Sequence, residues 1–227
     1  MTSNNLSMTM KQFNLRPDAT MHITGKPTRT LPAALLRASL LLLALGGGVC
    51  HAADRYLIDP EHTFSYFEYN HWSLSMQRSR FDSTRGSIEI DQASHSGSID
   101  IEIDAASIST GNDSFNQIMR SGNFFDAANY PKISFKSSSL HFEEQQLTQV
   151  DGDLTIKGIT HPVTLEIHNF NCRFMLVYGK QVCGANGSAK ILRSDYKLGR
   201  YVPFVSDAVT LHIDVEAIKE YNAPAPN

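Results

Sequence analysis

Histidine and carboxylate side chains are the groups of this sequence that could do acid–base or metal chemistry, and their spacing shows which chemistry is available. Seven histidines follow residue 53: His62, His71, His95, His141, His161, His168 and His212. None stands in the HxH, HxxxH or HExxH spacing of metal sites, and no GxSxG, P-loop or dinucleotide motif is present. The sequence therefore predicts no catalytic residue, no metal and no cofactor, and we expect a protein that is not an enzyme.

The carboxylates and a glycine-rich stretch point the same way. Acids in SIEID (87–91) and SIDIEID (98–104) alternate with isoleucines, so they face water on the outer side of a strand. The stretch GANGS (184–188) is expected between a hairpin and a strand rather than at the start of a helix. A phosphate cradle is therefore not expected there.

Aromatic residues form the second group that could contact a ligand. The stretch NFFDAANYPKISF (123–135) places Phe124 and Phe125 just before a turn set by DAAN and Pro131, and a strand with Phe135 follows. Aromatic rings ahead of a turn have two interpretations. They either plug the core, or they line a cavity that holds something other than protein.

His71 is the one histidine whose position suggests a role inside the fold. In TFSYFEYNHW (63–72) it follows Phe67 and Tyr69 at two-residue steps, so the three share the inward face of a strand. A core histidine with satisfied hydrogen bonds is one interpretation, and a ligand-facing histidine is the other. An enzyme acting on a lipid would need His71 as its acid or base.

The N-terminal region has the pattern of a secretory signal. Arg37 precedes an apolar run of 12 residues, Ala38–Val49, and CHAAD follows. A basic flank, a short apolar core and small exit residues are typical of a signal peptide, and the run is too short to span a bilayer. We expect residues 1–52 to be removed after Ala52 and the protein to lie in the periplasm, with Met21 as an alternative start. A lipid anchor at Cys50 is the alternative processing.

Removal of Cys50 leaves two cysteines, Cys172 and Cys183, in an exported chain. An even number of cysteines in an oxidising compartment favours a disulfide, and the spacing fits two strands joined near Gly179. A metal-binding pair is the competing interpretation, but no CxxC motif or neighbouring histidine supports it.

Two-residue alternation dominates residues 53–220 and predicts an all-β domain. It is clearest in five segments: 87–91, 98–104, 153–158, 162–170 and 208–218. We place breaks at 92–97, 145–146, 151–152 and 159–162. One helix is expected over 112–122, with Asn112 or Asp113 as its cap, a buried stripe of Phe115, Ile118 and Met119, and Gly122 at its end. Strands with one apolar face must stack as a sandwich or close as a barrel, and alternation does not decide between them.

The charge distribution excludes one class of partner. Five of the 20 basic residues but only one of the 23 acidic residues lie in 1–53, so residues 54–227 hold 15 and 22 and carry about −7. Nucleic-acid binding needs a concentrated basic face, so no nucleic-acid partner is expected. No membrane span is expected either, a homodimer is left open, and the proline-rich tail at 221–227 is predicted to fray.

Four stretches together resemble the YceI-like family of exported lipid- or polyisoprenoid-binding proteins. They are RYLIDPEHTFSYFEYNHW, RSGNFFDAANYPKISFKS, VDGDLTIKGITHPVTLEI and ILRSDYKLG, in order over about 55–218. The resemblance implies an eight-stranded antiparallel lipocalin-like barrel with one short helix over 53–220. It implies a long-chain isoprenoid ligand, an isoprenoid quinone or polyprenyl phosphate, and no catalytic residue. It gives pore-lining roles to Phe67, Tyr69, His71, Phe124, Phe125 and Phe135.

Two functions therefore compete. The first is non-enzymatic binding and carriage of an isoprenoid lipid in an apolar pore in the periplasm. The alternative is a stress-linked periplasmic interaction protein whose barrel is filled and whose surface binds partners, which predicts no cavity and an exposed apolar patch.

Overall fold

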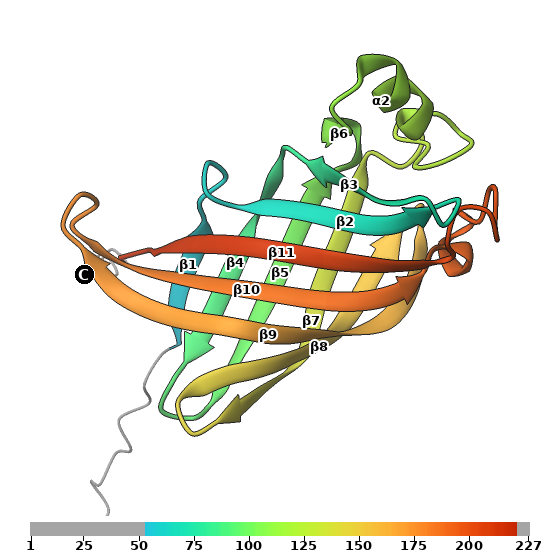
Figure 1. The fold of residues 1–227 in the computed structure, drawn as a ribbon. Helices are drawn as coiled ribbons and strands as arrows, with labels where there is room; N and C mark the ends of the chain where they lie inside the picture. The colour runs from blue at the N-terminus through green and yellow to red at the C-terminus, as the bar shows by residue number, and fades with distance from the viewer. Residues whose placement is uncertain (1–52, 222–227) are drawn as a thin grey trace, which may run out of the picture. The chain divides into compact units, whose positions relative to one another are not determined.

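The computed structural model describes residues 53–221, and the predicted signal and most of the C-terminal tail lie outside them. β-strands make up most of this region (Figure 1). The elements are β1 (Asp54–Ile58), β2 (Phe64–His71), β3 (Ser75–Phe81), β4 (Thr84–Asp91), β5 (Ser96–Asp104), a 3₁₀ helix (Ala105–Ser107), β6 (Ile108–Ser109), α2 (Asp113–Arg120), β7 (Lys132–Glu143), β8 (Gln146–Ile156), β9 (Ile159–Met175), β10 (Lys180–Leu192), a second 3₁₀ helix (Arg193–Tyr196) and β11 (Ala208–Lys219).

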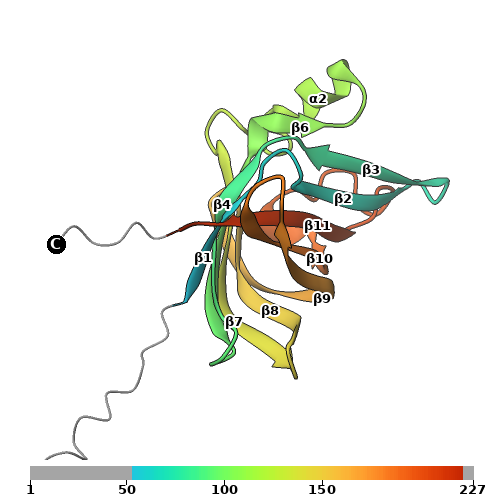
Figure 2. The same cartoon turned by 90° about the vertical axis from the view of Figure 1, so that its left-hand side faces the viewer.

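Eight of the strands close into an antiparallel barrel, which confirms the predicted fold. The ring runs β1-β4-β5-β7-β8-β9-β10-β11 and returns to β1. Strands β2, β3 and β6 extend the sheet from β11 and form a flap at one end of the barrel, where α2 also lies (Figures 1 and 2). Alternation alone did not decide between a sandwich and a barrel, and the closed ring excludes the sandwich.

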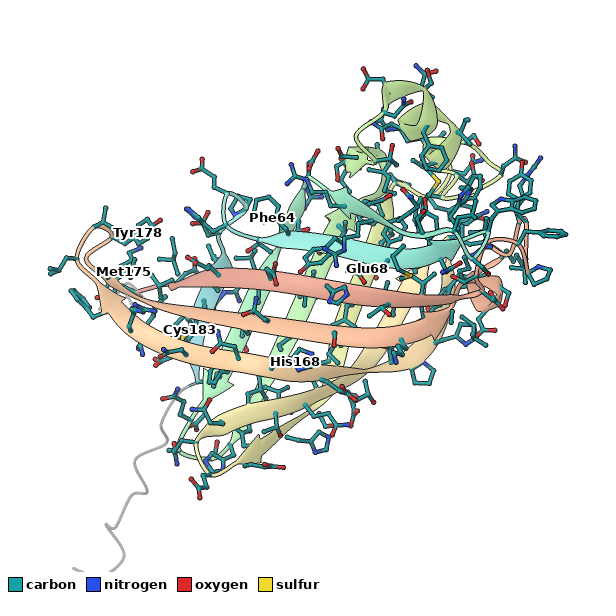
Figure 3. The ribbon with its side chains drawn as sticks, in the orientation of Figure 1. Phe64, Glu68, His168, Met175, Tyr178 and Cys183 are labelled. Carbon is teal, nitrogen blue, oxygen red and sulfur yellow. A yellow bond between two sulfur atoms is a disulfide. The ribbon has the colours of Figure 1, made fainter. Side chains whose placement is uncertain are left out.

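The alternating pattern explains why each strand has an inner and an outer face. In β4 and β5, Ile90 and Ile101 are buried, and Ile88 and Ile99 pack against the core, as predicted. In β9 the inward positions switch phase, because a bulge pairs Ile167 with Gly187 and Asn169 with Asn186. Outward side chains such as Glu68 on β2 lie on the water-facing side (Figure 3).

The turn after β8 was predicted in the wrong place. Strands β8 and β9 pair through Ile156 and Ile159, so the turn consists of Lys157 and Gly158, with φ of 51° and 72°. Two positive φ values are those of a type I′ turn, the turn that suits a two-residue hairpin. The predicted break at 159–162 is wrong, because these residues lie inside β9, where Pro162 pairs with Asp153 of β8. GANGS (184–188) likewise lies within β10, not between elements.

The predicted helix is α2, and its cap is confirmed. The Asn112 side chain accepts a hydrogen bond from the Phe115 N–H at 3.0 Å. The predicted buried stripe is wrong at Ile118, which is 49% exposed. Asn116 is buried instead, because its side-chain oxygen accepts hydrogen bonds from the N–H and hydroxyl of Thr110. The C-cap of the helix is Ser121 rather than Gly122.

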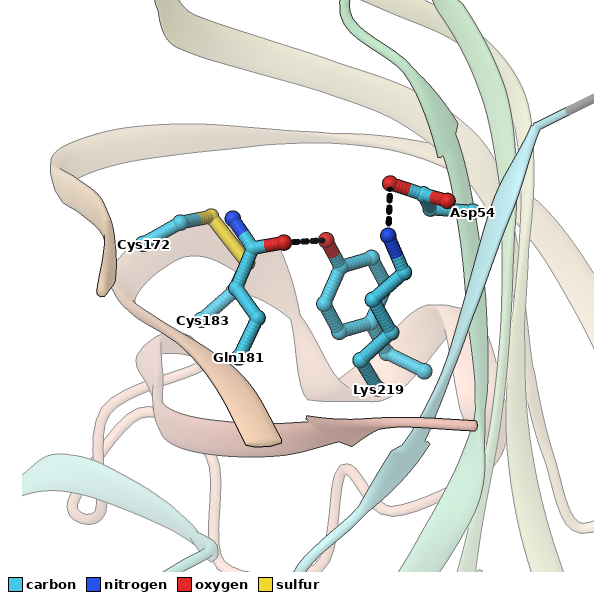
Figure 4. The surroundings of a disulfide bond; sticks show 6 residues. Asp54, Cys172, Gln181, Cys183 and Lys219 are labelled. Atoms are coloured by element: carbon cyan, nitrogen blue, oxygen red, sulfur yellow. Dashed lines mark hydrogen bonds and ion pairs between the residues drawn. A yellow bond between two sulfur atoms is a disulfide. The ribbon is translucent and has the colours of Figure 1, made fainter. Parts of the chain in front are cut away.

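The predicted disulfide is confirmed and joins β9 to β10 through Cys172 and Cys183 (Figure 4). It lies at the end of the barrel away from α2. Beside it, the Tyr56 hydroxyl donates to Gln181 at 3.2 Å, and Lys219 pairs with Asp54 at 2.6 Å. Burial, and secondarily Asp54, raises the pKa of Tyr56 to about 12. Covalent and polar contacts thus reinforce this end of the barrel.

The atoms around Gly152 on β8 leave no room for a side chain. A Cβ at this position would lie 2.5 Å from the Lys136 carbonyl oxygen and 2.5 Å from the Phe135 ring. We expect Gly152→Ala to lower the free energy of unfolding by about 2 kcal/mol or more, because backbone and ring must both shift. Urea denaturation measures the change.

Gly184 on β10 provides the matched control. A Cβ there would meet the Val215 carbonyl oxygen at 3.6 Å, an ordinary contact distance. Gly184→Ala should change stability by less than about 1 kcal/mol and in the stabilising direction, because alanine loses less backbone entropy on folding. Equal destabilisation by the two substitutions would contradict the packing argument.

Candidate functional site

The barrel encloses an apolar cavity of about 250 Å³ at the end where α2 lies. Its walls come from the inner faces of β2, β3, β5 and β7–β11, from α2 and from the segments that follow α2 and β10. Exposed residues among the lining set are His71, Arg200 and Tyr201, so the mouth of the cavity lies between them. The lining contains no Asp or Glu among the residues that the structure describes.

A second cavity of about 50 Å³ lies deeper in the barrel, toward the disulfide end. The two cavities share three wall residues, Ile101, Leu165 and Ile213. Because Tyr56 and Cys183 line the deeper cavity, it ends at the reinforced end of the ring. The two cavities therefore lie one after the other along the apolar interior of the barrel, with these three aliphatic side chains between them.

All six residues to which the family resemblance gave pore-lining roles lie on the wall of the first cavity. On β2, Phe67, Tyr69 and His71 succeed one another at two-residue steps on the inner side. Phe135 lines the cavity from β7. His71 is exposed at the mouth, so the interpretation of it as a core histidine is wrong. Contact of these side chains with a ligand stays a prediction.

Phe124 and Phe125 both line the cavity, but they do so differently. The Phe125 ring is buried and meets the rings of Phe67 and Phe81 edge-on, with centroid distances of 5.9 and 5.3 Å. Phe124 is only partly buried. The N–H of Phe125 donates to the Met119 carbonyl at 3.0 Å, which ties this segment to α2. Phe125 thus joins the helical segment to the flap. Because it packs in the core and also lines the cavity, both interpretations of the Phe-Phe pair apply.

Arg193, which sequence reasoning missed, organises the segment between β10 and β11. Its guanidinium is buried and donates to the carbonyl oxygens of Leu198, Arg200, Val205 and Ser206. Burial lowers its pKa from the usual value, and the charge of Asp207 opposes that shift. In the stretch ILRSDYKLG an arginine directly follows an apolar strand, which is the one feature of the sequence that could have indicated its role. Its partners are backbone carbonyl groups, which every residue has, so the sequence does not reveal them.

Tyr69 is a partly buried residue of the cavity wall that carries a hydroxyl group. Burial raises the pKa of its hydroxyl, while a hydrogen bond with Ser79 and the charge of Arg193 act against the shift. The hydroxyl is therefore neutral at physiological pH. The site as a whole can bury an apolar chain and offer N–H and O–H donors near one end, but its wall supplies no carboxylate as an acid or base.

The sequence of residues 56–217 matches the model of the YceI-like domain. The chain belongs to the YceI-like family. A YceI-like relative, a UPF0312 protein of Pseudomonas savastanoi pv. phaseolicola, is 30% identical over 194 residues, which cover 82% of this chain and all of the relative.

Solved YceI-like structures share the barrel. A YCEI protein of Campylobacter jejuni aligns with a TM-score of 0.58 and 26% identity, over 67% of this chain and 90% of that one. A polyisoprenoid binding domain from Saccharophagus degradans aligns with a TM-score of 0.56 over 73% of this chain and 98% of that one. Its sequence identity of 18% shows a common fold alone.

Substitution of Arg193 tests whether its hydrogen bonds stabilise the segment between β10 and β11 at the mouth of the cavity. Arg193→Met keeps the apolar stem but leaves four carbonyl oxygens without their donor, which we expect to lower the free energy of unfolding by about 3 kcal/mol. Denaturant unfolding measures the loss, and hydrogen exchange should show faster exchange over residues 198–206.

Arg200→Gln is the matched control, because Arg200 is exposed and its side chain hydrogen-bonds only to Asn123 among the described residues. It should change stability by less than about 0.5 kcal/mol. Similar losses for both arginine variants would show that charge, rather than the buried hydrogen bonds, stabilises the segment.

Proposed function

We propose that the protein binds and carries, without enzymatic chemistry, a long-chain isoprenoid lipid of the isoprenoid-quinone or polyprenyl-phosphate type in the bacterial periplasm. The observation that carries the proposal is the apolar interior of the barrel, with a cavity of about 250 Å³ that opens near His71, Arg200 and Tyr201 and a smaller cavity beyond it. The description of the Saccharophagus degradans relative as polyisoprenoid-binding supports the same ligand class.

The energetics favour a long apolar ligand. Removal of alkyl groups from water contributes about 0.8 kcal/mol per methylene, before the cost of ordering the chain. The walls offer aliphatic and aromatic side chains along the whole path, so each additional buried unit adds to affinity. A polar head would remain at the mouth, near His71, Arg200 and Tyr201.

Absence of a carboxylate from the cavity wall supports binding rather than catalysis. His71 has no acidic neighbour among the described lining residues with which to form an acid–base pair. The predicted signal peptide and the disulfide support an exported protein. The alternative function predicts a filled barrel and an exposed apolar patch. The cavity of about 250 Å³ argues against the filled barrel, whereas exposed apolar side chains are present.

Leu165, on the wall shared by the two cavities, gives the test of this function. We expect wild-type protein from the periplasm to carry an extractable isoprenoid lipid, seen by native mass spectrometry and by analysis of the solvent extract. Leu165→Trp fills the path and should lower the lipid content at least about tenfold, since the added ring occupies the space of the chain.

Glu166→Trp is the control, because the next residue of β9 points outward and is exposed. It should keep the wild-type lipid content. Circular dichroism confirms that both variants fold, and Ile213→Phe replaces Leu165→Trp if the latter does not. Bare wild-type protein, with no lipid in the extract, would contradict the proposed function.

A further inference from the structure

Large apolar side chains surround the mouth of the cavity and face water. They come from the β2–β3 turn with the start of β3 and from the segment between β10 and β11, which lie at the same end of the barrel (Figures 1 and 2). We call this set the mouth patch: Trp72, Leu74, Met76, Tyr201, Val202 and Phe204. Isolated apolar residues are common on protein surfaces, but a group of six in one place is typical of an interaction site. The β9–β10 hairpin at the opposite end carries a second exposed group, Phe174, Leu176 and Val177, which serves as the comparison below.

The two segments of the mouth patch are fixed to each other. The Trp72 N–H donates to the Phe204 carbonyl at 2.8 Å, and the Ser206 N–H donates to the Asn70 carbonyl at 2.9 Å. The rings of Trp72 and Phe204 stack with centroids 4.6 Å apart. The patch is therefore a preformed surface, because hydrogen bonds and ring stacking hold its two segments together.

The backbone holds two of these aromatic residues in an unfavourable conformation. Trp72 has a φ of 56° and Tyr201 a φ of 69°, in the left-handed region that bulky residues rarely adopt. Ser73 has a φ of 54°, so Trp72 and Ser73 form a type I′ turn, for which asparagine and glycine are the favoured residues. At both positions the strained residue presents an aromatic ring to solvent, where it contributes little to the stability of the core.

Cationic side chains lie beside the patch. Arg200 donates to the Asn123 side-chain oxygen at 2.6 Å, and Lys157 donates to the Gly122 carbonyl at 3.4 Å. Both partners are neutral, and within residues 53–221 neither cation pairs with a carboxylate. Residues 54–227 carry about −7 in total, and Arg200 and Lys157 give this end of the barrel two positive charges without a carboxylate partner among the described residues.

We propose that the mouth patch docks on an anionic lipid bilayer, with its aromatic and aliphatic side chains at the interface and Arg200 and Lys157 at the head groups. Tryptophan and tyrosine favour the membrane interface, and basic residues are attracted to anionic lipids. Docking would place the cavity mouth against the bilayer, so that the ligand moves between membrane and barrel without crossing water. This role rests on the proposed function.

Trp72 provides a direct readout, because it is the only tryptophan of the chain. Vesicles of phosphatidylcholine, with and without phosphatidylglycerol, are titrated into the protein while tryptophan emission and flotation are measured. We expect a blue shift of emission and co-flotation, both stronger with phosphatidylglycerol. Arg200→Gln should weaken binding to the anionic vesicles about fivefold and leave binding to the neutral ones unchanged.

The decisive variant is Leu74→Asp, at a side chain that is 84% exposed and does not line the cavity. It should lower the vesicle partition coefficient at least about tenfold, because a carboxylate replaces an inserted alkyl group beside anionic lipid. Leu176→Asp is the matched control. Leu176 is 90% exposed at the β9–β10 hairpin, whose tip carries Met175 and Tyr178 at the opposite end of the barrel (Figure 3).

Docking is supported if only Leu74→Asp loses vesicle binding. It is overturned if wild-type protein binds no vesicles, if both Asp variants bind equally, or if Leu74→Asp abolishes only binding of a protein partner. Lipid content, measured on the same preparations, separates this proposal from the function. A Leu74→Asp protein that keeps both its lipid and its vesicle binding overturns docking alone, whereas lipid-free wild-type protein that still docks overturns only the proposed ligand.

Discussion

Strand β11 forms hydrogen bonds with β1 through its last residues and with β2 through its first, and the rest of the architecture depends on this division. Where β1 ends and β2 begins, the buried Thr63 hydroxyl donates to the Glu216 carbonyl and accepts from the Glu216 N–H, both at 3.2 Å. The Glu216 carbonyl also accepts from the Asp59 N–H at 2.9 Å, so the Thr63 side chain takes the place of a backbone partner for the Glu216 N–H at the break in the ladder. The same edge of β11 can thus pair with β1, which closes the ring, near its C-terminal end and with β2, which belongs to the flap, near its N-terminal end.

The open end follows from that division, and three features complete it. Strand β2 leaves the ring with β3, so the gap between this flap and the rest of the barrel is covered by α2 and the segment after it. Phe125 fills the contact between the two parts against Phe67 and Phe81. Arg193 then fixes the remaining edge through carbonyl oxygens, which lets a buried cation exist without a carboxylate partner. The cavity owes its mouth to this arrangement.

Much of the fold, but less of the site, could be predicted from the sequence. Alternation reports which face of a strand is buried, so it located the strands and the isoleucines of β4 and β5. It carries no information on which strands pair, so the ring and its flap needed the structure. Ile118 was misplaced because Asn116 satisfies its polar atoms through Thr110 and occupies the inner position. Arg193 was missed because its partners are main-chain atoms, which look alike at every residue.

The contrast between the two ends decides how a ligand could enter. At the far end the β1–β11 ladder is closed, the disulfide joins β9 to β10, and Tyr56 lies hydrogen-bonded to Gln181 across the deeper cavity. These contacts tie neighbouring strands of the wall together at that end. At the mouth, exchange requires only side-chain movement at a surface already rich in apolar groups. Under the proposed function, a long lipid would enter tail first through the mouth and keep its polar head there, which is why the tests above are aimed at the residues around the mouth.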